Sequence, residues 1–215
     1  AAALAMGGFV AGPGGLLAWL TRTPLVVHEQ NAIAGLTNRW LARVATRVLG
    51  GFPARLGGRL AEDVGNPVRD DIAALTKTNQ DSAEARWHLL IIGGSQGASA
   101  LNRLVPAAVR ALPVAQRPEV WHQTGERQRA ETEQRYGDVA AKVTAFIDDM
   151  AGAYRWADLV VCRAGAMTVA ELACAGKPSI LVLFPFAVDD HQTANARYLE
   201  SRGAALLMAE SELSE

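Results

Sequence analysis

Short apolar runs that alternate with longer, helix-like stretches constrain the fold of this chain more than any other feature. Several of the runs are apolar throughout, which is typical of parallel strands covered by helices on both faces. Strand–helix alternation of this kind predicts a doubly wound α/β sheet. The expected strands are residues 25–28, 47–49, 61–64, 89–92, 120–123, 143–146, 159–162, 179–184 and 204–208, and the expected helices include 102–112, 127–136, 167–175 and 192–201.

The composition is that of a globular protein. Half of the 215 residues are hydrophobic and 20% are charged, which excludes a disordered or fibrous chain. The 21 Lys and Arg residues nearly balance the 22 Asp and Glu residues, so the charge does not favour nucleic acid as a partner. The two cysteines, Cys162 and Cys174, fit neither a disulfide framework nor a zinc motif. We therefore expect a reducing, cytoplasmic compartment.

A boundary between two α/β domains is expected at Gly65-Asn66-Pro67-Val68, because a polar segment, 69–85, follows before the next strong strand. Residues 1–68 would be the C-terminal part of a first domain, and residues 69–215 most of a second. The chain starts at Ala1 without an initiator Met and stops in what resembles the start of a helix. We therefore expect a fragment that lacks both ends of a longer protein.

The nearly continuous apolar stretch 4–20 resembles a signal peptide or a membrane span in hydrophobicity alone. It carries Gly12-Pro13-Gly14-Gly15 at its centre, and no basic residue precedes it. A spanning helix does not usually place Gly-Pro-Gly-Gly in its middle. We expect a glycine-rich loop followed by a buried helix.

Two strand-to-helix turns have the character of anion sites. The first is Gly93-Gly94-Ser95, which follows an apolar strand and precedes a helix. Free N–H groups and the helix dipole favour an anion there, and Ser95 adds a hydroxyl donor. The alternative is a tight turn that binds nothing, because the motif is neither a dinucleotide fingerprint nor a Walker loop.

The second turn follows the expected strand 159–162, and we place the helix start near Met167 or Thr168. Thr168 would cap the helix or donate to a phosphate, and Glu171 would accept hydrogen bonds from two sugar hydroxyls. The alternative for Glu171 is a capping box with Thr168.

Two further polar clusters follow expected strands. In the segment 184–196, Gln192 and Asn195 are amides of the kind that read hydroxyl groups. In His28-Glu29-Gln30-Asn31, a His beside a carboxylate is suited either to proton transfer or to a hydrogen-bonded structural role.

Two acidic pairs, Asp148-Asp149 and Asp189-Asp190, raise the question of a metal site. Neither pair has a third ligand at useful spacing. We therefore expect helix capping or a solvated loop for both pairs, and no bound metal.

Motifs of covalent hydrolases and of zinc proteases do not occur in the chain. Two anion-binding helix ends and a carboxylate placed to hold a ribose predict a nucleoside diphosphate ligand, of which a nucleotide sugar fits best.

Five motifs, in order along the chain, identify a family resemblance. They are 28–38 (HEQNAIAGLTN), 65–69 (GNPVR), 93–98 (GGSQGA), 146–150 (FIDDM) and 190–196 (DHQTANA). Together they resemble the MurG family, the undecaprenyldiphospho-muramoylpentapeptide β-N-acetylglucosaminyltransferases of bacterial peptidoglycan synthesis.

The resemblance implies a GT-B fold, which consists of two Rossmann-like domains with the first only partly present here. It implies an inverting glycosyltransferase that moves N-acetylglucosamine (GlcNAc) from UDP-GlcNAc to the 4-hydroxyl of the muramoyl sugar on undecaprenyl-linked lipid I, giving lipid II. It further implies a peripheral protein on the cytoplasmic face of the bacterial cell membrane, with no bound cofactor and no metal.

The resemblance also implies roles for individual residues. Ile147 offers backbone groups to the uracil, and Glu171 takes the ribose hydroxyls. The sugar of the donor faces Asn31 and Gln192, while Arg69 contacts the donor from the interdomain segment. The diphosphate is held by Ser95 and by the turn Ala166, Met167, Thr168, Val169 and Ala170. The acceptor-side loop comprises Gly7, Gly8, Gly12, Gly14 and Gly15.

The family's first glycine-rich loop with its histidine, and its apolar, basic-rimmed membrane patch, are expected upstream of Ala1, and its closing helices are expected after Glu215. The general base is therefore expected outside this chain, with His28 and Glu29 as weaker candidates. Two alternatives stay open, a UDP-GlcNAc 2-epimerase on the same scaffold and a donor-binding module without turnover.

Overall fold

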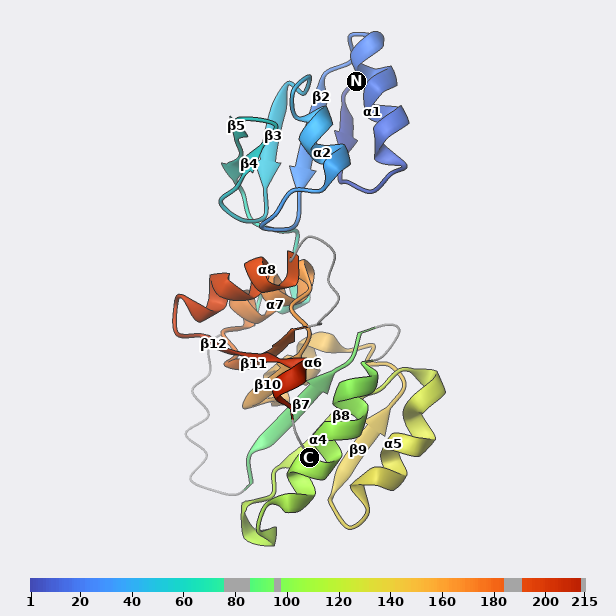
Figure 1. The fold of residues 1–215 in the computed structure, drawn as a ribbon, viewed down its shortest axis with the longest axis vertical. Helices are drawn as coiled ribbons and strands as arrows, with labels where there is room; N and C mark the ends of the chain where they lie inside the picture. The colour runs from blue at the N-terminus through green and yellow to red at the C-terminus, as the bar shows by residue number, and fades with distance from the viewer. Residues whose placement is uncertain (76–85, 95–97, 184–190, 214–215) are drawn as a thin grey trace. The chain divides into compact units, whose positions relative to one another are not determined.

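The computed structural model in Figure 1 describes residues 1–75, 86–94, 98–183 and 191–213. The chain divides into two compact units. The first unit comprises Ala1–Val68, Gly165–Ala170 and Ala187–Asn195, and the second comprises Arg69–Ala164, Glu171–Phe186 and Ala196–Glu215. The helices α7 (Ala166–Ala175) and α8 (His191–Glu200) contribute residues to both units. The boundary at residue 68 as a division between domains stays a prediction.

The first unit contains a four-stranded, all-parallel sheet in the order β1-β2-β3-β6. Helix α1 (Ala11–Leu20) connects β1 to β2, and α2 (Leu36–Leu41) connects β2 to β3. Buried side chains such as Leu25, Val27, Leu41 and Val48 form its core. The strands are β1 (Ala3–Ala5), β2 (Leu25–Glu29), β3 (Arg47–Gly50) and β6 (Glu62–Asp63), and β4 (Arg55–Leu56) and β5 (Arg59–Leu60) form a separate antiparallel pair.

Helix α1 corrects the expectation of a glycine-rich loop, because Gly12, Gly14 and Gly15 are helical residues. Pro13 is tolerated because it lies in the first turn, where a backbone N–H has no intrahelical acceptor. Gly15 lets α2 approach closely, since a Cβ at this position would lie 2.6 Å from Cδ2 of Leu41. The acceptor-loop glycines after Gly8 are therefore part of a helix.

The expectation that this helix is buried is also wrong. Only Gly15 and Ala18 are buried, whereas the large apolar side chains of its second half are between 49% and 64% exposed. Those side chains are Leu16, Leu17, Trp19 and Leu20. The helix packs on the unit through small residues, so its apolar character does not reflect burial. Among the helices described, none has the length and apolar character that a membrane span requires.

The second unit contains a six-stranded, all-parallel sheet in the order β12-β11-β10-β7-β8-β9. Counted from β7, this is the order 3-2-1-4-5-6 of the Rossmann fold, which confirms the prediction of a doubly wound α/β sheet. The strands are β7 (His88–Ile92), β8 (Glu119–Gln123), β9 (Ala141–Thr144), β10 (Leu159–Cys162), β11 (Ser179–Leu183) and β12 (Ala205–Ala209).

The remaining helices are α3 (Asp70–Ala73), α4 (Ser99–Ala111), α5 (Arg129–Tyr136) and α6 (Met150–Trp156). Helices α4 and α5 pack side by side (Figure 1). Their Leu101 and Tyr136 are fully buried in one apolar cluster with Ile91 of β7 and Val161 of β10. This cluster fixes the helices over the sheet, so the ends of these strands are held by a packed core.

The expected strands agree with the structure except at a few points. Strand β9 begins two residues before the predicted start and ends at Thr144, and β6 spans only two residues. Strands β1, β4 and β5 were not predicted. Strand β1 lies within the apolar stretch that continues into α1, so periodicity does not separate the two elements.

Candidate functional site

The candidate site lies at the carboxyl edge of the second sheet, where the strand order reverses between β7 and β10. The register pairs Ile92 with Cys162, the last residue of each strand. The turns that follow these two strands are therefore neighbours. In doubly wound sheets this reversal point is where ligands bind.

The glycine turn after β7 is held in shape by Gln123, a buried residue at the end of β8. Its side-chain Nε2 donates to the Gly94 carbonyl oxygen (3.1 Å), and the Gly94 N–H donates to its Oε1 (3.2 Å). Gly94 has a φ of +75°, a conformation that favours glycine. Gln123 was not among the predicted site residues, although a glutamine at the end of a buried strand beside a glycine turn is a usable signal. Ser95 lies outside the described residues.

Helix α7 begins at Ala166, earlier than predicted. Thr168 is consequently the third helical residue, which excludes the capping-box alternative because that motif requires Thr at the N-cap. Val169 is fully buried, and Met167 is 37% exposed. Within this predicted diphosphate turn, Val169 is packed in the core and its N–H already donates to the Gly165 carbonyl oxygen at 2.9 Å.

Glu171 is paired with Tyr154, which was not among the predicted site residues. The hydroxyl of Tyr154 in α6 donates to Oε2 of Glu171 at 2.9 Å. Burial, reinforced by the Glu171 charge and this hydrogen bond, raises the pKa of Tyr154. The pKa of the Cys162 thiol is raised to about 12, mainly by burial and to a lesser extent by the charge of Glu171. Cys162 is therefore protonated at neutral pH and unsuited to act as a nucleophile.

The charge of Arg69 also affects Tyr154. Its positive charge lowers the pKa of Tyr154, although burial and Glu171 outweigh it. The guanidinium is half exposed and forms an ion pair with Asp71 (Nε to Oδ1, 3.4 Å). The charges of two predicted donor contacts, Arg69 and Glu171, thus both affect the pKa of the buried Tyr154 hydroxyl.

The loop after β9 contains Ile147, which is buried, next to Phe146, which is 60% exposed. Asp149 is the N-cap of α6, and its carboxylate accepts a hydrogen bond from the Gly152 N–H at 2.7 Å. This confirms helix capping for Asp149. Within the described ranges, no group of three or more His, Cys, Asp or Glu residues is arranged to hold a metal. The pair Asp189-Asp190 lies outside those ranges.

In the first unit, Glu29 organises the turn that follows β2. Its buried carboxylate accepts four hydrogen bonds, from the N–H and Nδ2 of Asn31 (3.0 and 3.2 Å), the Gly35 N–H (3.1 Å) and Asn38 Nδ2 (2.9 Å). Both carboxylate oxygens are thus engaged. This arrangement favours a structural role for Glu29 over that of a general base.

His28 is buried, and both of its ring nitrogens have partners. Nε2 lies 3.0 Å from the Gly65 carbonyl oxygen, and Nδ1 lies 3.3 Å from Nε2 of Gln30. A carbonyl oxygen only accepts, which assigns the proton to Nε2 and leaves Nδ1 to accept from the amide. The structure favours the hydrogen-bonded alternative for His28.

Part of the predicted acceptor side borders a cavity of about 230 Å³ in the first unit. Gly7, Gly8, Glu29, Asn31 and Asn38 contribute to its lining, whereas Gly12, Gly14 and Gly15 do not. Gly7 and Gly8 both have positive φ, and a Cβ at Gly7 would lie 3.2 Å from Asn38 Nδ2. Glycine is therefore required for the shape of this wall.

Gln192 lies in the first turn of α8. Its Oε1 is buried and, among the residues described, has no hydrogen-bond partner. A buried amide oxygen without a partner is suited to accept a hydrogen bond from a ligand.

A parallel sheet in Rossmann order, with a glycine turn and a helix start at its reversal point, defines the class of α/β nucleotide-binding proteins. Within that class, the Glycosyltransferase family 28 C-terminal domain matches residues 88–215, and the corresponding N-terminal domain matches residues 1–50. The chain belongs to glycosyltransferase family 28.

The chain is similar to curated UDP-N-acetylglucosamine--N-acetylmuramyl-(pentapeptide) pyrophosphoryl-undecaprenol N-acetylglucosamine transferases. It is 59% identical to that of Chromohalobacter salexigens over 97% of this chain and 59% of the relative, and 55% identical to that of Alkalilimnicola ehrlichii over 99% and 61%. The chain thus spans about 60% of the length of these relatives.

Solved structures agree with this assignment. Acinetobacter baumannii MurG superposes with a TM-score of 0.84 at 42% identity, covering 99% of this chain and 61% of that one. The glycotransferase of kitacinnamycin, at 16% identity and a TM-score of 0.64, shares the fold (95% of this chain, 62% of that one). The resemblance to the MurG family and the GT-B fold class are confirmed.

Proposed function

We propose that the protein transfers GlcNAc from UDP-GlcNAc to the muramoyl 4-hydroxyl of undecaprenyl-linked lipid I, giving lipid II. The observation that carries this proposal is the reversal point of the second sheet, where a glycine turn, the start of α7 and a held carboxylate follow neighbouring strands. The names of the relatives supply the sugar and the lipid.

In the proposed reaction the muramoyl 4-hydroxyl oxygen attacks the anomeric carbon of GlcNAc. The bond from that carbon to the UDP β-phosphate oxygen breaks, a general base takes the hydroxyl proton, and the configuration inverts. The N-terminus of α7 stabilises the charge that develops on the departing UDP, because its N–H groups and dipole favour anions. We assign the base to neither His28 nor Glu29, because hydrogen bonds already occupy their acceptor atoms.

The donor contacts are proposed residue by residue. Ile147 meets the uracil through its backbone, Glu171 meets the ribose, and Arg69 meets the donor from the start of α3. Asn31 and Gln192 meet the GlcNAc hydroxyls, which agrees with the lack of a hydrogen-bond partner for Gln192 Oε1 in the described part of the chain. The diphosphate lies at Ser95 and at the turn 166–170.

Steady-state kinetics of Glu171→Ala test the donor site. Loss of two hydrogen bonds to a charged group predicts a Michaelis constant for UDP-GlcNAc raised about ten- to a hundredfold, with the constant for lipid I unchanged. Glu131→Ala is the control, because Glu131 is an exposed carboxylate on α5. An unchanged donor constant for Glu171→Ala removes Glu171 from the ribose.

Product analysis separates the alternatives. One neighbour of the fold, at 12% identity and a TM-score of 0.67, is a putative UDP-N-acetylglucosamine 2-epimerase from Listeria monocytogenes. An epimerase converts UDP-GlcNAc into UDP-ManNAc without lipid, and a donor-binding module binds UDP-GlcNAc in calorimetry without turning over lipid I.

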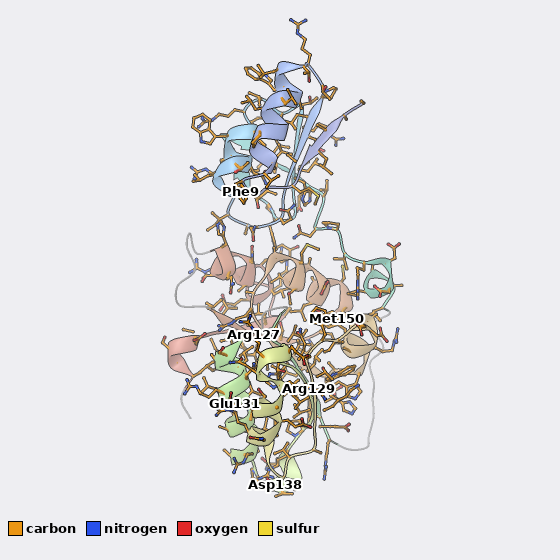
Figure 2. The ribbon with its side chains drawn as sticks, turned by 90° about the vertical axis from the view of Figure 1, so that its right-hand side faces the viewer. Phe9, Arg127, Arg129, Glu131, Asp138 and Met150 are labelled. Carbon is orange, nitrogen blue, oxygen red and sulfur yellow. The ribbon has the colours of Figure 1, made fainter. Side chains whose placement is uncertain are left out.

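We also propose that the exposed apolar side chains of α1 and α2 contact the cytoplasmic face of the membrane. Helix α1 packs beside α2, and Phe9, just before α1, is 87% exposed (Figure 2). Neither helix contains an acidic residue, and the Arg43 guanidinium lies 4.4 Å from the Trp40 ring centroid. Apolar and aromatic side chains next to arginines favour an anionic bilayer surface. We thus propose membrane contact for this chain in addition to the apolar patch that we expected upstream of Ala1.

Sedimentation with phosphatidylglycerol vesicles tests this second proposal. Phe9→Ser should reduce the bound fraction, because an exposed aromatic side chain that inserts between lipids is lost. Val114→Ser, at a 66% exposed apolar position of the second unit, is the matched control. Equal losses for both variants would contradict the proposal.

A further inference from the structure

Tyr154 is a fully buried residue with a polar atom to which the proposed reaction gives no role. It lies in the second half of α6, the helix that begins at Met150 (Figure 2), and its ring belongs to the core of the second unit. Its hydroxyl donates to Oε2 of Glu171, 17 residues further along the chain, at 2.9 Å. A core of this kind is equally well filled by phenylalanine, so the hydroxyl calls for an explanation.

The direction of this hydrogen bond is fixed by chemistry. A carboxylate oxygen only accepts, and the tyrosine hydroxyl has a single proton to give. Burial raises the pKa of Tyr154, so the hydroxyl keeps that proton at neutral pH. A hydrogen bond to a charged acceptor in a buried setting is among the stronger ones in proteins.

The bond also restricts a side chain that is otherwise mobile. Glu171 is only half-buried, and a glutamate on a helix has several rotatable bonds. With Oε2 tied to α6, the carboxylate is held in one orientation, and among the described residues no hydrogen-bond donor to Oε1 competes with a ligand. A carboxylate held in this way loses less entropy when it binds two adjacent hydroxyl groups.

Helix α6 therefore connects the two contacts proposed for the nucleoside, Ile147 and Glu171. Asp149 caps the helix directly after Ile147, the proposed uracil contact, and Tyr154 reaches Glu171 from the same helix. The proposed contacts to the base and to the sugar are thus positioned by one helix.

We propose that Tyr154 is a positioning residue that holds the Glu171 carboxylate in place to read a ribose diol, and so makes the site selective for ribonucleoside over dideoxyribonucleoside diphosphates. This inference rests on the proposed donor site. It assigns Tyr154 no contact with the substrate.

Calorimetry with two probes, UDP and 2′,3′-dideoxyuridine 5′-diphosphate, tests the inference. Tyr154→Phe should weaken UDP binding about three- to tenfold, the range for one lost hydrogen bond, and leave binding of the dideoxy compound unchanged. In a Glu171→Ala background the same substitution should have no further effect, because the carboxylate it positions is absent.

Tyr136→Phe is the matched control. Tyr136 is also fully buried in the second unit, and its hydroxyl lies 2.8 Å from Nδ1 of His122, away from the proposed donor contacts. It should alter neither binding constant. Thermal unfolding of both variants compares their stability directly.

The outcomes separate this inference from the function on which it rests. If Tyr154→Phe weakens both probes equally, or if its effect persists in the Glu171→Ala background, the hydroxyl has a merely structural role and the inference is wrong. If Glu171→Ala weakens UDP binding but Tyr154→Phe does not, the donor site stands and only the inference falls. If Glu171→Ala leaves UDP binding unchanged, the ribose assignment itself is overturned.

Discussion

The buried carboxylate of Glu29 offers a sharp test of how the turn after β2 is held. Each oxygen of Glu29 receives two N–H donors, so Glu29→Gln places an amide NH₂ where two donors already point. The amide can turn either way, and in both orientations one pair of donors loses its acceptor. Two lost charge-assisted hydrogen bonds, offset in part by the lower cost of burying a neutral group, predict a loss of about 3 kcal/mol.

The assay is urea unfolding of the chain, followed by hydrogen exchange of the Asn31 and Gly35 amides. The exchange of both amides should accelerate in Glu29→Gln, because each N–H donates to the carboxylate. Glu62→Gln is the matched control, because Glu62 is an exposed carboxylate paired with Arg47 in the same unit, and it should change stability little. Equal destabilisation by the two substitutions would refute the idea that the Glu29 network holds this turn.

Three further changes have defined outcomes. Gly14→Ala should raise the free energy of unfolding by about 0.5–1 kcal/mol, because the position is helical with open space around it. Gly57→Ala should lower the free energy of unfolding by more than Gly14→Ala raises it, because φ at Gly57 is +56° and a Cβ there would lie 2.5 Å from a backbone oxygen. The midpoints of urea unfolding of the two variants test both predictions. A stabilising Gly57→Ala would contradict this geometry. Burial lowers the pKa of His122 to about 3 in the folded protein. Between about pH 6.5 and pH 3, the unfolded chain therefore binds a proton that the folded protein does not bind. The free energy of unfolding should fall in this range by roughly 1.4 kcal/mol for each unit by which the pH drops. In unfolding curves at pH 7 and pH 5, His122→Asn should flatten this dependence, and parallel curves for wild type and variant would count against it.

Hydrophobic periodicity along the chain was sufficient to predict the doubly wound class and most strand positions. Polar and glycine residues just after apolar runs also marked the edge where the candidate site lies. These features are local, because the period of a segment reports which of its faces is buried. The failure at α1 has the same origin. Gly-Pro-Gly-Gly usually breaks a helix, but here Pro13 lies in the first turn and Gly15 admits Leu41.

Which turns become neighbours was decided only by the tertiary structure. Strand β7 lies between β8 and β10, so the turns near residues 93 and 163 share one edge although about 70 residues separate them. The partners Gln123 for Gly94 and Tyr154 for Glu171 arise in the same way, from packing between segments distant in sequence. Local propensity determines what each segment can form, but buried polar atoms find their partners only when the sheet order brings them within hydrogen-bond distance.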